Sequence, residues 1–353
     1  MRVLIVRLSS MGDLVQTLPA LTDASRAIPE IRFDWAVDES FAQIPSWHSH
    51  VDNVFAASFR RWGKNLREAV TSGEMRPFLR SLRQHNYDVI VDVQGEWKSA
   101  TVARLAKGPA LGYDQRSVHE WGAHGLYSKR FTVPKGQHSM RRMRQLLSQA
   151  LGYTFVEENI DYGIVRTRLP EVSIAVTSPY LVFIHSTAWE SKNWPEHYWC
   201  ELVRQAKDAG FQIVLPWGSE DERLKSLRIA AENNRVLVLP PLSISEKASI
   251  ISRAVATVGL DTGLSHIAAA LDVPSVTLYG ATDPALVGAM GKNQVHMVSD
   301  FECLGCHETR CDYQQPSEFK PACFVGLRPE EVWRRLEGLV EVGRGYADQN
   351  RRV

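Results

Sequence analysis

The sequence predicts an α/β fold of two Rossmann-like domains that face a shared cleft. At 353 residues the chain exceeds the size at which a single hydrophobic core stops growing, so two domains are expected. Short apolar runs alternate with helical patterns, which is typical of parallel sheets covered by helices. Each half also contains one polar loop directly after a strand of buried type, at residues 8–13 and 261–266. Open α/β sheets bind ligands at such strand ends.

The N-terminal half shows this alternation from its first residues. Strands are expected at residues 2–7, 31–37 and 87–93. Three helices are expected in this half. The first reaches from the first loop to about Ile28, the second carries Lys98 and Arg104, and the third spans Ser139 to Leu151. Pro19 is expected near the first turn of its helix, where a missing N–H is tolerated. Repeated strand-then-helix units predict a parallel sheet with helices on both faces.

A polar segment at residues 165–178 lacks clear periodicity and is predicted to link the two domains. The expected divisions are an N-terminal domain at 1–168, a C-terminal domain at 179–328, and a final helix and tail at 329–353. The alternation then restarts, with strands expected at 180–185, 211–215, 235–239, 254–260 and 275–279. The first helix of this half is expected to begin at Pro195, a good first helical position, and to stop at Gly210.

Charge is unevenly distributed, although the formal net charge is only +1. Residues 1–170 hold 23 Lys and Arg against 17 Asp and Glu, and the remainder holds 18 against 23. A basic N-terminal half suits an anionic partner, although such an excess is more often solvated surface. Nucleic acid is not expected, because the total charge is near zero and no nucleic-acid motif is present.

Hydropathy indicates a protein without a membrane span. No stretch approaches the roughly 20 apolar residues that cross a bilayer, and no charged and apolar leader precedes the first strand. A cytoplasmic protein is therefore expected, with any membrane contact peripheral.

Four of the five cysteines have the spacing C-x2-C-x4-C-x11-C, at Cys303, Cys306, Cys311 and Cys323. Such a set could hold a zinc ion, or it could be four ordinary reduced thiols. Only one pair has the tight spacing of a zinc ribbon, and the surrounding segment reads as a loop. The pattern therefore favours unliganded thiols, and no metal is expected.

The first loop places Asp13 after Gly12 at the end of the first strand. Glycine lets the chain turn sharply and lets a ligand approach closely. A carboxylate at this position could be a general base, or it could simply cap the following helix. The loop alone does not decide between the two. The G-x-G-x-x-G fingerprint of dinucleotide-binding folds is absent, which argues against an NAD-dependent dehydrogenase.

The second loop is more informative. Thr262 and Gly263 put amides at the start of a helix, which suits a diphosphate, and Asp261 and His266 would flank that site. The plainer alternative is that Thr262 is a helix cap and that His266 is hydrogen-bonded in the core. A carboxylate in one half and a phosphate-type loop in the other together indicate an enzyme.

Further candidates follow other strand ends of the second half. Ser186, Thr187 and Lys192 could bind phosphate, and Glu222 could hold ribose hydroxyls. The plainer alternative for the first three residues is an ordinary polar loop with an exposed lysine. For Glu222 it is an acid that stabilises the start of a helix. In the first half, Arg60, Arg61, Lys64 and Arg67 form a basic cluster that could receive a phosphorylated or carboxylated acceptor. Solvated surface is the usual role of such a cluster.

Taken together, these motifs resemble the ADP-heptose:lipopolysaccharide heptosyltransferases, glycosyltransferase family 9. The resemblance rests on residues 2–21, Lys192 to Pro195, and Gly259 to His266. Residues 41–48 and 60–62 make it most like heptosyltransferase I. It spans about residues 1–300, and the joint presence of these motifs is highly specific.

The resemblance implies a GT-B fold, with the acceptor on the N-terminal domain and the nucleotide sugar on the C-terminal one. It implies inverting transfer of L-glycero-D-manno-heptose from ADP-heptose to the first Kdo of Kdo-lipid A, at the cytoplasmic face of the inner membrane. Asp13 would be the general base. The implied donor-site residues are Ser186, Thr187, Lys192, Glu222, Asp261, Thr262, Gly263 and His266, and the implied acceptor-site residues are Ser10, Gly12, Arg60, Arg61 and Lys64.

No cofactor is expected, because helix-start amides and Lys192 can stabilise the departing ADP without a divalent metal. Two features depart from the family. Ala188 stands where many relatives have a second threonine, and the segment from Cys303 to Cys323 is longer than in familiar first-heptose members. Two alternatives therefore stay open, namely another heptosyltransferase with a different acceptor and a non-catalytic nucleotide-sugar-binding protein of the same shape.

Overall fold

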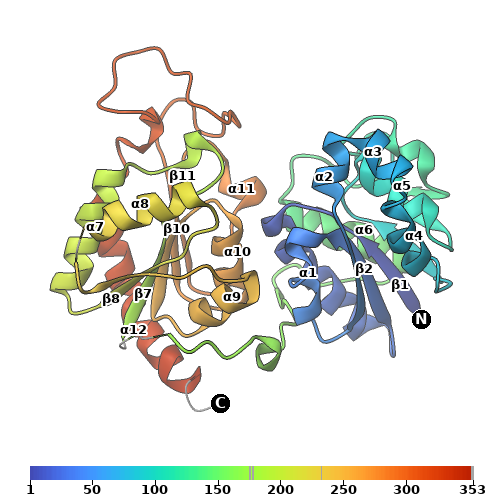
Figure 1. Ribbon diagram of the computed structural model, residues 1–353, viewed down its shortest axis with the longest axis horizontal. Coiled ribbons are helices and arrows are strands. Elements are labelled where there is room, and N and C mark those ends of the chain that lie inside the picture. Colours follow the sequence, from blue (N-terminus) through green and yellow to red (C-terminus); the bar gives the residue numbers. More distant parts are fainter. Residues whose placement is uncertain (175, 177–178, 232, 351–353) are drawn as a thin grey trace. The chain divides into compact units, whose positions relative to one another are not determined.

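The computed structural model describes residues 1–174, 176, 179–231 and 233–350. The chain divides into two compact units, Met1–Arg168 and Leu169–Val353 (Figure 1). Each unit contains one sheet flanked by helices, as Figure 1 shows.

The first unit is built on six parallel strands in the order β3-β2-β1-β4-β5-β6. Their bounds are β1 Arg2–Val6, β2 Arg32–Asp38, β3 Val51–Ala57, β4 Val89–Asp92, β5 Ala110–Tyr113 and β6 Lys129–Phe131. Val3 of β1 pairs with Phe33 on one side and with Val89 on the other. Strand β1 is central and its apolar residues have no exposed surface, which explains why it reads as a continuous hydrophobic run.

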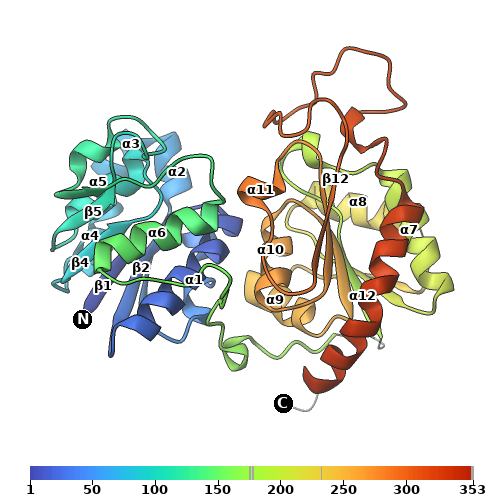
Figure 2. The same cartoon turned by 180° about the vertical axis from the view of Figure 1, so that it is seen from behind.

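The helices of this unit are α1 Met11–Ala27, α2 Phe59–Lys64, α3 Leu66–Thr71, α4 Met75–Leu82, α5 Trp97–Leu105 and α6 Ser139–Leu151. Single 3-10 turns lie at Glu39–Phe41, Pro45–Trp47, Ala123–Leu126 and Arg166–Arg168. Helices α1 and α6 lie side by side (Figure 2). A buried ion pair of 2.6 Å between Arg144 and Asp23 joins them.

One expectation for α1 was wrong. Pro19 lies well inside the helix rather than in its first turn, and it is buried. Proline removes one intrahelical hydrogen bond there. The helix persists because ten of its residues are buried, so tertiary packing outweighs the local cost.

The second unit repeats the same topology. Its six parallel strands have the order β12-β11-β10-β7-β8-β9. Numbered within each unit, both sheets follow the order 3-2-1-4-5-6 of Rossmann folds. The strands are β7 Tyr180–Ile184, β8 Gln212–Leu215, β9 Val236–Val238, β10 Ala256–Leu260, β11 Ser275–Tyr279 and β12 Gln294–Val298.

The helices of the second unit are α7 Glu196–Asp208, α8 Glu220–Ala230, α9 Ile244–Ser252, α10 Gly263–Ala270, α11 Pro284–Val287 and α12 Pro329–Asn350, with 3-10 turns at Glu190–Lys192 and Ala322–Phe324. Pro195 is the N-cap of α7 and not its first helical residue as predicted. Helix α12 packs beside α7 (Figure 2), and its residues Val332, Leu336 and Val340 belong to the core of this unit.

The sequence pattern found the long central elements and missed several short ones. Strands β3, β5, β6 and β12 and helices α2 to α4 were not predicted. They lack a long apolar run or clear periodicity, so tertiary contacts define them. Parts of the predicted linker (175, 177 and 178) and tail (351–353) lie outside the described residues. In the part of the chain that is described, no helix is long and apolar enough to cross a bilayer.

Candidate functional site

The chain order reverses at the centre of each sheet, and several of the candidate residues follow the strands at this point. In the first unit β1 and β4 are neighbours, and in the second β7 and β10 are neighbours. A doubly wound sheet leaves a crevice beyond the carboxyl ends of such a strand pair, because successive helices leave on opposite faces. Asp13 follows β1, and Asp261 follows β10.

Asp13 is held by two neighbours on its own loop. The Arg7 guanidinium lies 2.7 Å from its Oδ2 atom, and the backbone N–H and hydroxyl of Ser10 donate to the same oxygen at 3.1 and 2.7 Å. The N-cap of α1 is Ser10, whereas Asp13 is the third helical residue and completes a capping box. Asp13 is therefore not the N-cap itself, although it does stabilise the helix start.

The electrostatics of Asp13 favour the carboxylate. Burial opposes ionisation, but the Arg7 charge and the Ser10 hydrogen bonds outweigh it and lower the pKa of Asp13. The side chain is 32% exposed. The three contacts converge on Oδ2, and none of them involves Oδ1. An ionised oxygen near a strand end can accept a proton from a bound hydroxyl.

The neighbouring strand end stabilises the Asp13 loop, a feature that the sequence reasoning missed. The Gln94 side-chain oxygen accepts the N–H of Leu8 at 2.7 Å. Gln94 is positioned in turn by buried Asp92, whose carboxylate accepts the Gln94 and Gly95 amides, the Ser99 hydroxyl and the Tyr127 hydroxyl. Burial raises the pKa of Asp92. The only sequence signal was an acid at a strand end.

Asp261 is the centre of a network at the end of β10. Its Oδ2 accepts from the Lys192 ammonium at 2.7 Å and from the Thr282 hydroxyl at 2.8 Å, and His266 Nε2 lies 3.6 Å from Oδ1. Burial opposes ionisation, but the His266 hydrogen bond and the Lys192 charge lower the pKa of Asp261 well below its usual range. The structure thus brings together three predicted residues and adds Thr282, which was not predicted.

Lys192 has donors left after this ion pair. An ammonium group carries three N–H donors, and Asp261 takes one of them. The ammonium also lies 4.2 Å from the centre of the Trp189 ring, which is a cation–π distance. Lys192 is consequently fixed in place while still able to bind an anion.

Helix α10 begins where the second predicted loop ends. Thr262 occupies the N-cap position without a capping hydrogen bond from its side chain, and Gly263 is the first helical residue. Gly259 on β10 packs so closely against Ser265 that an added Cβ would collide with the Ser265 hydroxyl oxygen. This close contact sets the helix start directly beyond the strand end, where backbone amides suit an anion.

The remaining donor-site candidates lie on two further strand ends. Ser186 and Thr187 follow β7 and are half-buried, and the Ser186 hydroxyl is buried. Glu222 is in the first turn of α8, and its carboxylate accepts the Gly218 N–H at 2.6 Å. That contact supports the plainer interpretation of Glu222 as an acid that stabilises a helix start.

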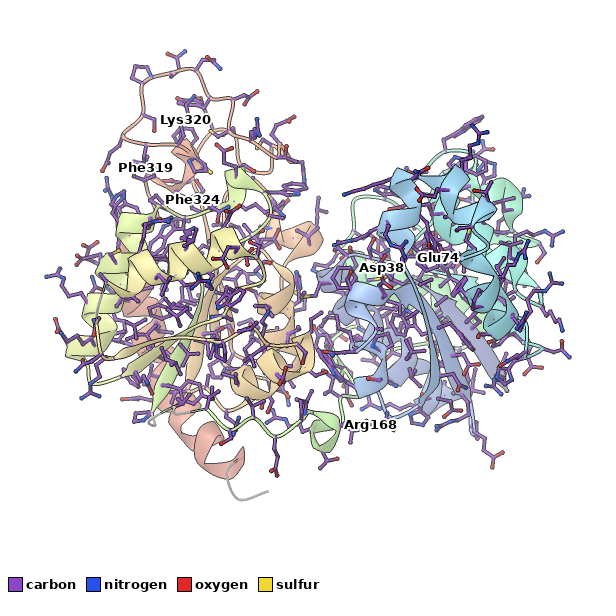
Figure 3. All side chains as sticks on the ribbon, viewed as in Figure 1. Asp38, Glu74, Arg168, Phe319, Lys320 and Phe324 are labelled. Atoms are coloured by element: carbon purple, nitrogen blue, oxygen red, sulfur yellow. The ribbon has the colours of Figure 1, made fainter. Side chains whose placement is uncertain are left out.

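Of the basic cluster, Arg60, Arg61 and Lys64 lie on α2 and Arg67 lies on α3. Two acids labelled in Figure 3, Asp38 and Glu74, contact its first two members. The Arg60 N–H donates to Asp38 at 2.9 Å, and its guanidinium lies 4.6 Å from the centre of the Phe41 ring. Arg61 forms an ion pair with Glu74. Lys64 is exposed. Arg61 is thus partly neutralised, which leaves Arg60 and Lys64 as the better cations for an anionic ligand.

Comparison with known proteins decides the family. The profile of glycosyltransferase family 9 (heptosyltransferase) matches residues 75–316. Lipopolysaccharide heptosyltransferase 1 of Pseudomonas aeruginosa is 45% identical over 350 residues, covering 96% of this chain and 98% of the relative. This chain belongs to glycosyltransferase family 9. The Escherichia coli K12 lipopolysaccharide heptosyltransferase 1 is 44% identical and covers 84% of this chain and 92% of its own.

Solved structures of the family agree with the fold. E. coli heptosyltransferase WaaC with ADP matches with a TM-score of 0.84 and 39% identity, over 96% of this chain and all of that one. WaaC with ADP-2-deoxy-2-fluoro heptose matches with a TM-score of 0.82. The predicted α/β fold of GT-B class is confirmed, and the protein is a heptosyltransferase of lipopolysaccharide biosynthesis.

The cysteines of this family member are all free thiols. Cys323 is buried, and its sulfur lies 2.5 Å from the position that a Cβ on Gly280 would take. Phe319, Lys320 and Phe324, labelled in Figure 3, mark the same segment. Within the described ranges, no three His, Cys, Asp or Glu side chains gather in an arrangement that could hold a metal ion.

Proposed function

We propose that this heptosyltransferase moves L-glycero-D-manno-heptose from ADP-heptose to the first Kdo of Kdo-lipid A with inversion, using Asp13 as the general base. The observation that carries the mechanism is the ionised Asp13 carboxylate at the end of β1, with Oδ1 outside its three contacts. The choice of acceptor rests on the 44–46% identity to proteins named lipopolysaccharide heptosyltransferase 1.

The proposed reaction is a single displacement at the anomeric carbon of the heptose. Asp13 Oδ1 accepts the proton of the acceptor hydroxyl while the hydroxyl oxygen of the acceptor attacks the anomeric carbon of the heptose. The bond from that carbon to the ADP oxygen breaks, and ADP leaves with the electron pair. One displacement inverts the anomeric configuration. Asp13 then releases its proton to water.

The second unit stabilises the charge that develops on ADP. Lys192 and the amides at the start of α10 supply positive charge and N–H donors, with Ser186 and Thr187 as hydroxyl donors. Glu222 holds the ribose, and Asp261 and His266 line the donor site. This set of donors supports the displacement without a divalent metal.

The acceptor is anionic, which suits the first unit. Ser10, Gly12, Arg60, Arg61 and Lys64 form the proposed acceptor site, and residues 1–170 carry an excess of basic over acidic side chains. Lipid A lies in a bilayer, so we place the enzyme peripherally on the cytoplasmic face of the inner membrane. Binding to anionic vesicles should weaken as ionic strength rises.

The deciding experiment is transfer from ADP-heptose to Kdo-lipid A, with and without EDTA, by the wild type and Asp13→Asn. The expected result is EDTA-resistant turnover of the wild type, inverted anomeric configuration in the product, and near-complete loss in the variant. Turnover only on an already heptosylated acceptor would keep the family chemistry and replace the acceptor. Donor binding without turnover on any acceptor would leave the non-catalytic alternative.

A further inference from the structure

The loop between β7 and α7 carries Ser186, Thr187 and Lys192, yet it contains only one short 3-10 turn. Regular hydrogen bonding between backbone groups therefore does not determine the shape of this loop. Side chains must instead satisfy those carbonyl groups of the loop that turn away from solvent. Two residues do this, Asn193 at the end of the loop and Lys225 on α8.

Asn193 closes the loop from within. Its side-chain amide donates to the Thr187 carbonyl at 3.1 Å and to the Trp189 carbonyl at 2.7 Å. Lys225 then holds Asn193, because its ammonium donates to the Asn193 side-chain oxygen at 3.2 Å. The same ammonium donates to the His185 carbonyl at 2.9 Å. One lysine thus ties both ends of the loop to α8.

Lys225 is half-buried among several charged groups. Glu196 on α7, Glu222 and Arg228 on α8, and His185 at the end of β7 all lie within its electrostatic reach. Burial lowers the pKa of Lys225 to about 8, while Glu196 and Glu222 favour the charged form. Lys225 is therefore mostly protonated at neutral pH. His185 is fully buried, and its pKa is lowered to about 4 by burial and by the Lys225 charge, so it stays neutral.

These contacts matter for an anion. A carbonyl oxygen that turned toward a phosphate would repel it, whereas a carbonyl held by Asn193 or Lys225 cannot turn. Lys225 therefore keeps the His185 carbonyl occupied, and Asn193, which Lys225 holds, keeps the Thr187 and Trp189 carbonyls occupied. The hydroxyls of the loop and Lys192 are left for a ligand. Lys225 also adds one positive charge on the same helix as Glu222.

We propose that Lys225 is a positioning residue of the donor site, which holds the loop of residues 185–193 through Asn193 in the shape that binds a nucleoside diphosphate. This inference rests on the proposed function only in taking that loop as the diphosphate-binding loop. Lys225 acts through Asn193 and the backbone, and it is not placed on the substrate.

The test compares Lys225→Met and Lys225→Arg with Lys207→Met, which alters an exposed lysine on α7. ADP is the probe, titrated by calorimetry, and the donor and acceptor KM values are measured separately. Lys225→Met should weaken ADP binding and raise the donor KM by about 10- to 100-fold, because buried acceptors lose a charged donor. The acceptor KM should stay unchanged. Lys225→Arg should recover most of the affinity, and Lys207→Met should match the wild type.

A double-mutant cycle with Asn193→Ala tests the route of the effect. The two losses should be far from additive, because Lys225 acts on the Thr187 and Trp189 carbonyls through Asn193. Additive losses would overturn the proposed route. Unchanged ADP affinity in folded Lys225→Met, or equal losses for donor and acceptor, would overturn the inference.

A pH comparison keeps the inference testable if Lys225→Met does not fold. Between pH 7 and 9 the wild type should lose ADP affinity as Lys225 deprotonates, whereas Lys225→Arg should keep a flatter profile. Identical profiles, or no ADP binding by the wild type, would overturn the inference. Lys225-dependent ADP binding without transfer to Kdo-lipid A would instead overturn the proposed acceptor and leave this inference standing.

Discussion

The two sheets have the same strand order and yet present opposite chemistry at their central strand ends. Beyond β1, the Asp13 carboxylate is partly exposed, and its contacts with Arg7 and Ser10 all involve Oδ2 rather than Oδ1. Beyond β10, the Asp261 carboxylate is buried and has Lys192, Thr282 and His266 as close neighbours. In the proposed mechanism Asp13 is the general base, whereas Asp261 orients the Lys192 ammonium through their ion pair. The strand order determines where each carboxylate lies, and the side chains that contact it determine its exposure and charge.

The largest expected effect tests the first half of this comparison. Asp13→Asn keeps the shape and removes the base, so kcat should fall by about 10²- to 10⁴-fold while ADP affinity stays constant. Steady-state kinetics and ADP titration measure the two quantities. The control is Asp52→Asn, which removes only a surface partner of Arg32 and should leave kcat unchanged. Retained turnover in Asp13→Asn would show that the base lies elsewhere.

The second prediction concerns the cation at the other strand end. Lys192→Met should weaken ADP binding by about 10- to 100-fold, since a charged donor to phosphate is lost. It also strands the buried Asp261 carboxylate, so the melting temperature should fall. Adding Asp261→Asn should restore stability without restoring ADP binding, and Lys292→Met serves as an exposed control. Full ADP affinity in Lys192→Met would place the diphosphate away from β10.

The third prediction uses a feature that the units share, a buried neutral histidine in each. Burial lowers the pKa of His48 to about 3 and that of His185 to about 4, with the Lys225 charge adding to the second. The unfolded chain takes up these protons below about pH 6.5, so the folded state loses stability as the pH falls from there toward 4. At pH 5 each histidine should cost about 2 kcal/mol relative to pH 7.

Urea denaturation of His48→Gln and His185→Gln at both pH values measures this. Each variant should show a smaller difference between pH 5 and pH 7 than the wild type. His119→Gln, which changes an exposed histidine, should not. An unchanged pH dependence in both variants would mean that neither histidine stays unprotonated when folded.

The smallest expected effect refines the role of Asp13. Arg7 lowers the pKa of Asp13, and a base must be deprotonated to act, so activity is lost only as the pH falls below the usual range of aspartate. Arg7→Met should move the acidic limb of kcat/KM to higher pH. A pH–rate profile beside that of Arg116→Met, an exposed control, detects the shift. An unmoved limb would mean that another group sets it.

The candidate site was predictable where it depends on local order. A buried strand followed by Gly12 and Asp13, or by Asp261, Thr262 and Gly263, indicates a ligand loop from consecutive residues. Gln94, Thr282 and Lys225 were missed because their partners Leu8, Asp261 and Asn193 lie 86, 21 and 32 residues away. No local pattern reports such contacts.

The amino-acid sequence by itself determined the two sets of β-α units, the central strands and the two loops that end them, because periodicity and turn residues act over short distances. It also determined the family, through motifs read in order along the chain. Tertiary structure alone decided that the Asp13 carboxylate is partly exposed, whereas the Asp261 carboxylate is buried in contact with Lys192. This difference depends on burial and on neighbouring charges: Arg7 reaches Asp13 through the fold of their own loop, and the sheet topology brings Lys192 to Asp261 from a separate part of the chain.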